Sequence, residues 1–244
     1  MMAFYKDRFA DAGDFTFFFV GNLDIEAMKP LIAQYLGSLP AIDRKESWRD
    51  NNIEYRKGNI LNEYAKEQET PMATIAMMYT GKCKYTLKNN ILMSMLNQAF
   101  DMVFTEEIRE KEGGTYGVSC AGQIEKLPRE EFIMQVVYQT DPAKKDHLNG
   151  IIDKLVAQIA AEGPSEENLA KIKEYMLKTF KDDQKENGYW LNNLVEYYSN
   201  GIDNTKDYEA IVSGITVKDV QEFANSLFKQ GNKATIIMTV PEEN

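Results

Sequence analysis

Residues 108–119 read IREKEGGTYGVS, and they join two segments whose apolar residues are spaced differently. From Leu87 to Arg109 apolar residues recur every three or four positions, which predicts one long amphipathic helix. After the glycines, TYGVSCAG and EFIMQVVYQT alternate at period two around EKLPRE, which predicts two paired strands with a turn at residues 127–128. Gly113 or Gly114 suits the left-handed cap of the helix. The stretch therefore predicts a helix that reverses directly into a strand pair.

The residues N-terminal to this helix predict three further elements. DFTFFFVGN, residues 14–22, is a short apolar run between glycines and predicts a strand. Asp24 is placed to cap a following helix, IEAMKPLIAQYLG, in which Pro30 implies either a kink or a helix that begins near the proline. Residues 41–59 lack apolar periodicity and predict an extended linker. MATIAMMYTG, residues 72–81, predicts a strand that opens a larger unit.

The C-terminal half predicts consecutive helices and one closing strand. Asp141 and Pro142 form a cap and first-turn proline, Ser165 caps the next helix, and a further helix surrounds YWLNNLVEYYSNG. Thr216 with Asp219 resembles a capping box, and KATIIMTV closes the chain as a strand. A strand, a helix and a strand pair followed by helices and a returning strand favour an α+β fold with helices on one face of the sheet.

Composition excludes several function classes. The chain has 244 residues, 43% of them hydrophobic, which is enough for a substantial core. Acidic residues outnumber basic ones by 38 to 28, and the net charge of −10 would repel a nucleic-acid backbone. No apolar run reaches the ~18–20 residues that span a bilayer, and the first residues, MMAFYKDRFADAGD, lack the apolar core of a signal peptide, as would a fragment of a longer exported protein. We expect a soluble protein, for which the periplasm and the cytoplasm both remain open.

The metal-ligating and nucleophilic residues are too few for a complete hydrolytic site. Cys83 and Cys120 are far apart in sequence and form neither a disulfide framework nor a zinc motif. A mononuclear zinc site usually takes several His or Cys ligands, and His147 is the single histidine. We expect His147 to be an exposed helix residue. Ser119 lies in G-x-S-x-x-G between strands, which is not the nucleophile elbow of hydrolases.

Arg109 and Tyr116 are the strongest candidates for a functional pair. The predicted reversal at the glycines brings the start of the strand beside the last helical turn, so a guanidinium and a phenol converge there. Both groups donate hydrogen bonds, and converging donors suit a substrate carbonyl or a developing oxyanion. The alternative is an arginine paired with a nearby carboxylate and a tyrosine packed at the sheet edge. The residues by themselves favour that alternative.

A resemblance to a known family favours the functional interpretation of Arg109 and Tyr116. REKEGGTYGVS, with its arginine seven residues before its tyrosine, resembles the Arg/Tyr element of the insulinase-like zinc metallopeptidases, the M16 or pitrilysin family. FTFFFVGNLDIEAMKPLIAQYLGSLP is similar to the segment between the two homologous modules of these proteins, and PSEENLAKIKEYMLKTF is similar to their late helices. The resemblance implies a LuxS/mitochondrial-processing-peptidase-like α+β module with a mainly antiparallel sheet. It covers nearly the whole chain.

The resemblance also implies roles for individual residues. Arg109 and Tyr116 match the pair that grips the substrate backbone and stabilises the tetrahedral intermediate. Gly113, Gly114 and Thr115 then belong to the substrate-binding element, with Gly114 the weaker of the two glycines as a direct contact. The implied substrate is an extended peptide, bound when a second module closes over it.

The sequence departs from the family in one respect: it has no H-x-x-E-H zinc motif. Zinc, the cofactor of the full enzyme, is therefore expected outside this chain, in the same polypeptide or in a partner subunit. We expect residues 1–58 to be a strand-helix and linker from the junction with a preceding module, and residues 59–244 to be the C-terminal-type domain. Residues 9–20 and 228–239 align without gaps. The similarity is either a coincidence or a sign that the chain begins with the end of one module and then contains a complete second copy.

Three functions remain to be separated. The leading one is the substrate-binding, non-metal part of a zinc endopeptidase, inactive in isolation. The second is a non-catalytic interaction subunit, since the family includes such degenerate halves. The third is a glycine-hinged binding domain unrelated to proteolysis, for which Arg109 and Tyr116 would lie apart. Peptide specificity and oligomeric state are not readable from this sequence.

Overall fold

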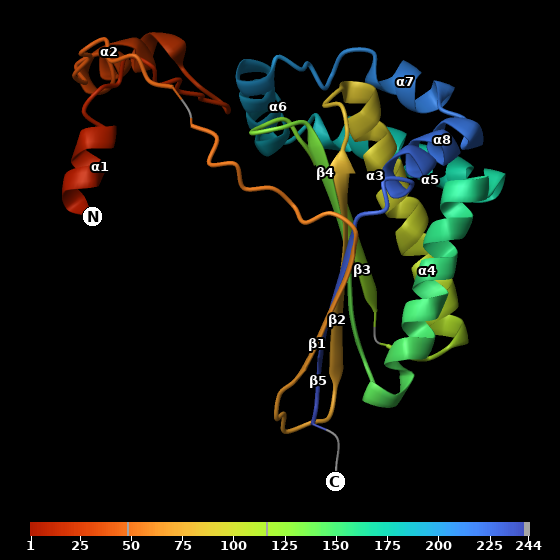
Figure 1. Ribbon diagram of the computed structural model, residues 1–244. Helices are drawn as coiled ribbons and strands as arrows, with labels where there is room; N and C mark the ends of the chain where they lie inside the picture. Colours follow the sequence, from red (N-terminus) through yellow and green to blue (C-terminus); the bar gives the residue numbers. More distant parts are fainter. Residues whose placement is uncertain (48, 116, 242–244) are drawn as a thin grey trace. The chain divides into compact units, whose positions relative to one another are not determined.

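A computed structural model describes residues 1–47, 49–115 and 117–241. The chain forms two compact units, which are described separately. Unit 1 consists of Met1–Ile53 and Lys181–Asp203, and unit 2 of Glu54–Phe180 and Asn204–Asn244. Figure 1 shows the elements of both units in chain order.

Unit 2 is built on one five-stranded sheet. Its strands are β1 (Asn59–Ala65), β2 (Ala73–Lys82), β3 (Val118–Glu125), β4 (Glu131–Thr140) and β5 (Lys233–Thr239). They lie in the order β1-β5-β2-β4-β3, with β1 and β5 parallel and the other neighbours antiparallel. The predicted strand pair is confirmed as β3 and β4, and the predicted strands 72–81 and KATIIMTV are β2 and β5. The strand β1 was not predicted, and its residues are almost all exposed.

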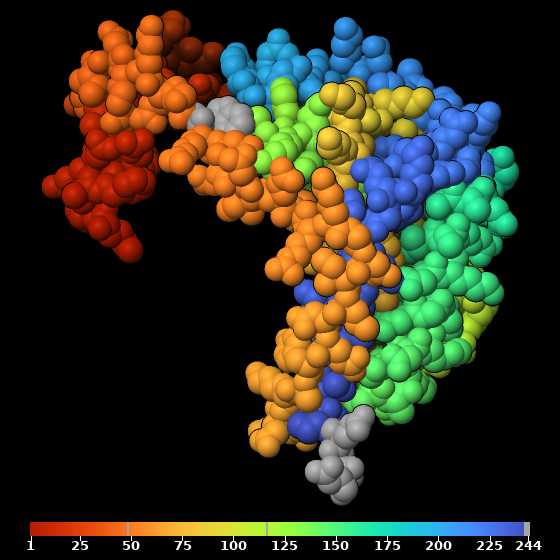
Figure 2. Space-filling view, viewed as in Figure 1, coloured from red at the N-terminus to blue at the C-terminus, as the bar shows by residue number. Residues whose placement is uncertain are grey.

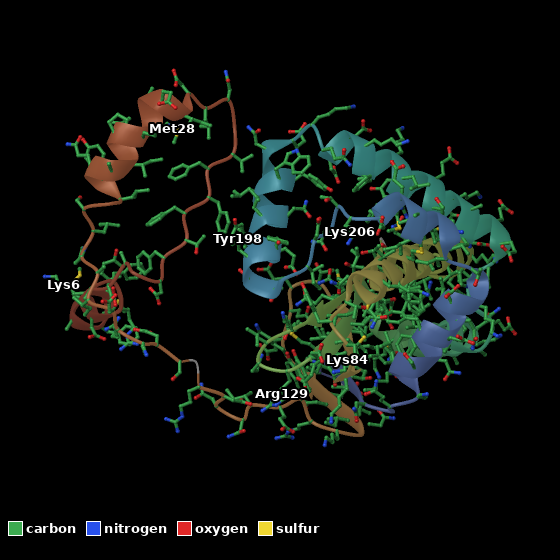
Figure 3. All side chains as sticks on the ribbon, turned by 90° about the horizontal axis from the view of Figure 1, so that it is seen from above. Lys6, Met28, Lys84, Arg129, Tyr198 and Lys206 are labelled. Carbon is green, nitrogen blue, oxygen red and sulfur yellow. The ribbon has the colours of Figure 1, made fainter. Side chains whose placement is uncertain are left out.

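Helices cover one face of this sheet, as the sequence predicts for an α+β fold. The helices α3 (Leu87–Phe104), α4 (Lys145–Glu162) and α8 (Val217–Phe228) lie on the same side of the strands (Figure 1). The core between them contains fully buried side chains such as Phe100, Met77 and Met134. Figure 3 shows side chains crowded between the sheet and these helices. Two further helices, α5 (Glu166–Asp183) and α7 (Tyr208–Gly214), follow α4.

The predicted helix caps are confirmed. The Asp141 carboxylate accepts a hydrogen bond from Ala143 N at 2.8 Å, in a 3-10 turn (Pro142–Lys144) that leads into α4. The Ser165 hydroxyl accepts one from Asn168 N at 3.1 Å at the start of α5. Thr216 and Asp219 form the capping box of α8. These short polar side chains satisfy N–H groups that have no partner within the first turn.

The long helix predicted for residues 87–109 changes its geometry near its end. The regular α-helix stops at Phe104 and continues as a π-helix over Thr105–Lys111. The wider turn is visible at Glu112, whose N–H bonds to Glu107 O, five residues back, at 3.3 Å. A π-turn shifts every later side chain around the helix axis relative to an α-helix. Arg109 therefore does not point where the periodicity of α3 would place it.

Unit 1 contains α1 (Met2–Arg8), α2 (Ile25–Tyr35) and α6 (Asn187–Asn200). Asp24 caps α2 by accepting from Ala27 N at 3.0 Å, so the cap is confirmed and a helix start near Pro30 is wrong. The strand predicted for residues 14–22 is also wrong, since the described part of unit 1 contains no strand with which this run could pair. An apolar run becomes a strand only when a neighbour pairs with its backbone.

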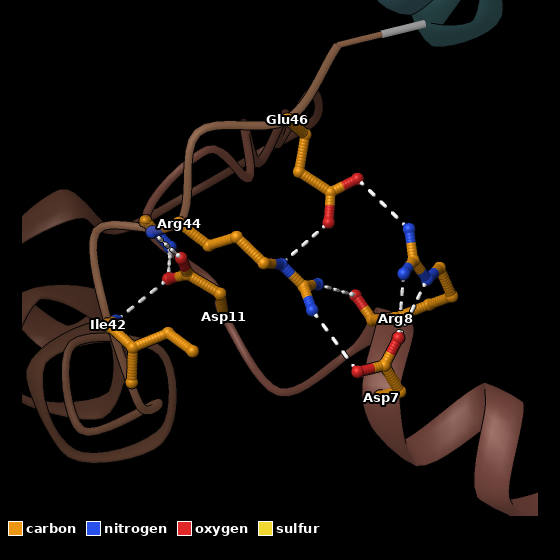
Figure 4. A network of polar contacts seen from close by, with 7 residues as sticks. Asp7, Arg8, Asp11, Ile42, Arg44 and Glu46 are labelled. Carbon is orange, nitrogen blue, oxygen red and sulfur yellow. Dashed lines mark hydrogen bonds and ion pairs between the residues drawn. The ribbon is translucent and has the colours of Figure 1, made fainter. Parts of the chain in front are cut away.

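A carboxylate rather than an apolar core organises unit 1. Asp11, 4% exposed, is the one buried residue among the described residues of this unit. It accepts backbone N–H groups from Gly13, Ile42 and Arg44 at 3.0, 3.0 and 2.6 Å (Figure 4). These hydrogen bonds, Gly13 first, lower the pKa of Asp11. Arg44 also pairs with Glu46 at 2.7 Å. The hydrogen bonds of Asp11 tie residues 11–13 to residues 42–44.

The two edge strands of the sheet in unit 2 differ in the contacts that they make with the helices. Along the edge strand β3, Asp101 of α3 accepts from Cys120 N at 3.4 Å, and Asn97 of α3 donates to Gly122 O at 2.8 Å. Side chains of the adjacent helix thus occupy backbone groups that an added strand would need. The other edge strand, β1, is part of the orange segment at the surface in Figure 2. β1 pairs with β5 along its whole length, and its Glu63 side chain also forms an ion pair with Lys145 of α4 at 3.0 Å.

Candidate substrate-binding site

The candidate site lies where the π-helix ends and the chain reverses into β3. Gly113 has φ = 55°, the left-handed value expected of a glycine that ends a helix, and it confirms the predicted cap. Gly114 N then bonds to Ile108 O at 3.3 Å. We call Gly113, Gly114, Thr115 and Gly117 the glycine loop. Tyr116 lies outside the described residues.

Two hydrogen bonds and one close packing contact fix the position of Gly114. Its N–H closes the helix, and its carbonyl accepts a hydrogen bond from the Thr140 hydroxyl at 2.5 Å. A Cβ atom at this position would lie 2.7 Å from Leu148 Cδ1. Leu148 is fully buried in α4, so it has little room to move away. Gly114 therefore has a packing role that anchors the start of the loop to β4 and α4.

Arg109 is exposed on the π-helix, and no ion pair or hydrogen bond links its side chain to another described residue. Its neighbours on the same helix are engaged: Lys111 pairs with Glu107 at 2.6 Å and with Glu106 at 3.0 Å. The carboxylate pairing considered for Arg109 from the sequence is thus not found within 1–47, 49–115 and 117–241. Whether Arg109 and Tyr116 converge stays a prediction.

Thr115 and His147 complete the polar contacts around the loop. The Thr115 hydroxyl donates to Gly117 O at 3.0 Å and accepts from Gly117 N at 3.2 Å, so it braces the loop from within. His147 is exposed, as predicted, and its Nε2 lies 3.0 Å from Glu112 Oε2. This contact joins the first turns of α4 to the residue before Gly113.

The glycine loop opens onto a pocket of about 680 Å³. That volume falls within the ~300–1,000 Å³ typical of ligand pockets. The other lining residues come from the start of β2, the end of β4 and the segments beside them: Pro71, Met72, Thr74, Val137, Tyr138, Gln139, Thr140 and Asp141. Gly113, Gly114 and Thr115 line this pocket, whereas Arg109 is not among the lining residues, and the predicted substrate-binding role of these residues stays a prediction.

Sequence reasoning missed the strand residues of this pocket. Phe132, Met134, Val136 and Tyr138 of β4 alternate toward the helices and are buried. Val137 belongs to the opposite face, where it is 37% exposed. An apolar residue at a solvent-facing position of an alternating strand was the available signal. Its significance depends on the loop that lies beside it, which the strand pattern does not reveal.

A metal site is not apparent in the described part of the chain. No group of three or more His, Cys, Asp or Glu side chains there could hold a metal ion. Burial raises the pKa of the Cys83 thiol to about 11 and that of Cys120 to about 12. Because the thiolate is the form that binds zinc, both environments disfavour a metal ligand. Among the same residues, no helix is both long and apolar enough to cross a membrane.

Comparison with known proteins adds a family match. The family model described as the peptidase M16 inactive domain matches residues 1–176. A probable zinc protease of Escherichia coli, PqqL, is 23% identical over 193 residues, which are 78% of this chain and 20% of the relative. A PQQL-like zinc protease of Arabidopsis thaliana is 22% identical over 212 residues, or 82% and 22% of the two chains. This chain thus spans about a fifth of each of these curated relatives.

Solved structures share the fold. The periplasmic protease PqqL from Escherichia coli has a TM-score of 0.74 at 18% identity, with 91% of this chain and 25% of that chain covered. The ferredoxin protease FusC, solved as a mutant in complex with Arabidopsis ferredoxin, has a TM-score of 0.76 at 15% identity, covering 91% and 24%. A protease from Helicobacter pylori has a TM-score of 0.76 at 17% identity, covering 90% and 54%.

Proposed function

Because the chain belongs to the peptidase M16 family, whose inactive-domain model it matches over residues 1–176, we propose that it is the substrate-binding part of a zinc endopeptidase. Its substrate is an extended peptide, and its partner is a zinc-binding M16 module in the same polypeptide or in another subunit. The relatives described as zinc proteases support this proposal. Residues 1–58 then form the junction with a preceding module, and residues 59–244 the C-terminal-type domain.

The observation that carries the proposal is the position of the glycine loop. It follows directly on the helix of Arg109 and lines the 680 Å³ pocket. Arg109, exposed and without a partner among the described residues, is available to a peptide carbonyl. In the proposed role Arg109 and Tyr116 donate hydrogen bonds to the substrate backbone and to the oxyanion that forms on hydrolysis. Gly113, Gly114 and Thr115 position this pair.

The described residues of this chain do not fit a zinc site, and none of them takes part in a step at the metal. The exposed His147 already lies against Glu112, and the two thiols are in burial environments that oppose ionisation. In the complete enzyme, zinc supplies an activated water molecule. The contribution of this chain is to bind and orient the peptide and to stabilise charge.

Exposed apolar residues in unit 1 support the proposed junction. Residues of α1, α2 and α6 are all at least partly exposed, and large side chains such as Phe17, Leu31 and Tyr198 remain accessible within the unit. Phe18 and Tyr198 make an edge-to-face contact at 5.5 Å, but no described apolar residue of the unit is buried. A segment with so little burial gains stability from a neighbouring module that covers it.

The test is to mix the purified chain with the H-x-x-E-H half or subunit and to measure cleavage of a fluorogenic peptide. We expect activity in the mixture and none from this chain by itself. Arg109→Ala and Tyr116→Phe should each lower kcat ~10²–10³-fold, the usual cost of losing one oxyanion donor. Matched controls are Arg49→Ala and Tyr175→Phe, at exposed positions outside the site, which should leave kcat unchanged.

Unchanged kcat in both site variants would contradict the catalytic role of this pair. Activity of the zinc half that does not depend on this chain would instead favour a non-catalytic interaction subunit.

A further inference from the structure

The pocket beside the glycine loop opens on the face of the sheet that the helices leave uncovered. Thr74 of β2 and Val137 and Gln139 of β4 occupy alternate positions, facing away from the buried residues Ile75, Val136 and Tyr138. Met72 extends the wall just before β2. The glycine loop forms the remaining side. The floor of the pocket is therefore a strand surface, and its rim is a loop.

The described walls of this pocket carry few charged groups. Gln139 Nε2 donates to Thr74 Oγ1 at 3.2 Å, so one hydrogen bond joins these two polar side chains. Thr115 is hydrogen-bonded within the glycine loop. Asp141 is the one ionisable side chain, apart from the phenol of Tyr138, among the described lining residues, and its Oδ1 already accepts from Ala143 N. Among the described lining residues, Pro71, Met72 and Val137 contribute apolar side chains that are at least partly exposed.

We propose that this pocket is a specificity subsite that takes an uncharged, apolar side chain of the bound peptide, with Val137 as its main determinant. The proposal rests on the proposed function, because it concerns the same peptide site. An apolar side chain gains from leaving water against Val137 and Met72. An acidic side chain would lose hydration there beside the Asp141 carboxylate, and a basic one would find, among the described lining residues, that single carboxylate, whose Oδ1 already accepts from Ala143 N.

The experiment measures binding to the 244-residue chain directly, by isothermal titration calorimetry. The probes are four blocked decapeptides that are identical except for a central Leu, Phe, Glu or Lys. We expect the Leu and Phe peptides to bind about tenfold more tightly than the Glu and Lys peptides, or better. Val137→Asp should reduce binding of the Leu and Phe peptides and favour Lys, whereas Val137→Lys should favour Glu.

Ile236→Asp is the matched control. Ile236 is β-branched, 37% exposed like Val137, and on the same uncovered face, but it lies on β5 outside this pocket. It should leave the order of the four affinities unchanged. Opposite preferences in the Asp and Lys variants cannot arise from misfolding, because a misfolded chain would lose all four peptides together.

Equal affinities for the four peptides, no detectable binding of the Leu and Phe peptides, or a preference for Lys in the unaltered chain would each overturn the subsite. Failure of the subsite can be distinguished from failure of the proposed function by a second measurement. In the reconstituted protease, loss of kcat in Arg109→Ala with no change of preference in Val137→Asp would reject the subsite and keep the function. Peptide selectivity that changes in Val137→Asp, together with an unchanged kcat in Arg109→Ala, would keep the subsite and reject the catalytic role of Arg109.

Discussion

At the scale of single residues, the two adjacent glycines are needed for different physical reasons. Gly113 adopts φ = 55°, a conformation that costs an L-residue roughly 1–2 kcal/mol, and nothing lies within 4 Å of its missing side chain. Gly114 is required by packing, since a Cβ atom would lie 2.7 Å from Leu148 Cδ1. The sequence shows both residues as glycine and does not distinguish the two requirements.

We predict that Gly114→Ala lowers the free energy of unfolding by ~1–3 kcal/mol, the usual cost of overpacking a core. The buried Leu148 must shift, and the hydrogen bond from Thr140 to Gly114 O is strained with it. Urea denaturation monitored by fluorescence measures the change. Gly117→Ala is the control, because no atom lies within 4 Å of its Cβ position, and it should stay within about 0.5 kcal/mol. Equal effects of the two substitutions would refute the packing role.

At the scale of elements, several helices begin at a side-chain cap that is readable in the sequence. α8 has the most complete one. Thr216 N and Oγ1 both donate to Asp219 Oδ2, at 2.9 and 2.5 Å, and Asp219 N donates back to Thr216 Oγ1 at 3.2 Å. Lys88 at the start of α3 adds an ion pair to Asp219 at 2.9 Å. The capping box therefore also ties two helices of unit 2 together.

This capping box should make stability depend on acid pH. Hydrogen bonds from Thr216, and then from Lys88, hold the pKa of Asp219 below its ordinary value. A carboxylate whose pKa is lower in the folded state contributes stability above its unfolded pKa of ~3.9 and loses it as pH falls further. We predict that the stability difference between the unaltered chain and Asp219→Asn shrinks as the pH is lowered from about 6 to about 3.

Urea denaturation at a series of pH values measures this difference. Thr216→Ser keeps a capping hydroxyl and is the control, which should retain the acid dependence of the unaltered chain. A difference between the unaltered chain and Asp219→Asn that is constant over the whole range would show that Asp219 is not linked to folding through its proton.

At the scale of the whole molecule, the two units are stabilised differently. Unit 2 buries a continuous apolar core between one sheet face and its helices. Unit 1 instead has a buried carboxylate that gathers three backbone N–H groups, and its apolar side chains remain accessible. A unit held by a few hydrogen bonds depends more on its neighbours for stability than one with an apolar core.

We predict that the isolated chain binds no stoichiometric zinc and that a chelator leaves its unfolding midpoint unchanged. A metal bound to the folded state would stabilise it by mass action, so its removal would lower the midpoint. Elemental analysis after equilibration with zinc and thermal unfolding with and without EDTA provide the two measurements. The H-x-x-E-H half is the positive control. One zinc per chain, or chelator-sensitive proteolysis by the chain itself, would contradict the proposal.

Features that depend on neighbouring residues could be predicted from the sequence. Period-two alternation and short apolar runs located β2, β3, β4 and β5, and short polar caps located the starts of α2, α5 and α8, because strand faces and helix termini are local properties. The sequence also indicated Gly113, Gly114 and Arg109 as candidate site residues. These local signals were enough to indicate the α+β fold and, through resemblance, the family.

Features that need a partner distant in sequence became known from the folded chain. The apolar run at residues 14–22 is not a strand, because no described segment pairs with its backbone, whereas the nearly fully exposed β1 is one, because β5 pairs with it. Val137 lines a pocket because the glycine loop, Met72 and Thr74 meet beside it. Pairing and pocket walls are contacts between separate segments, and no local pattern records them.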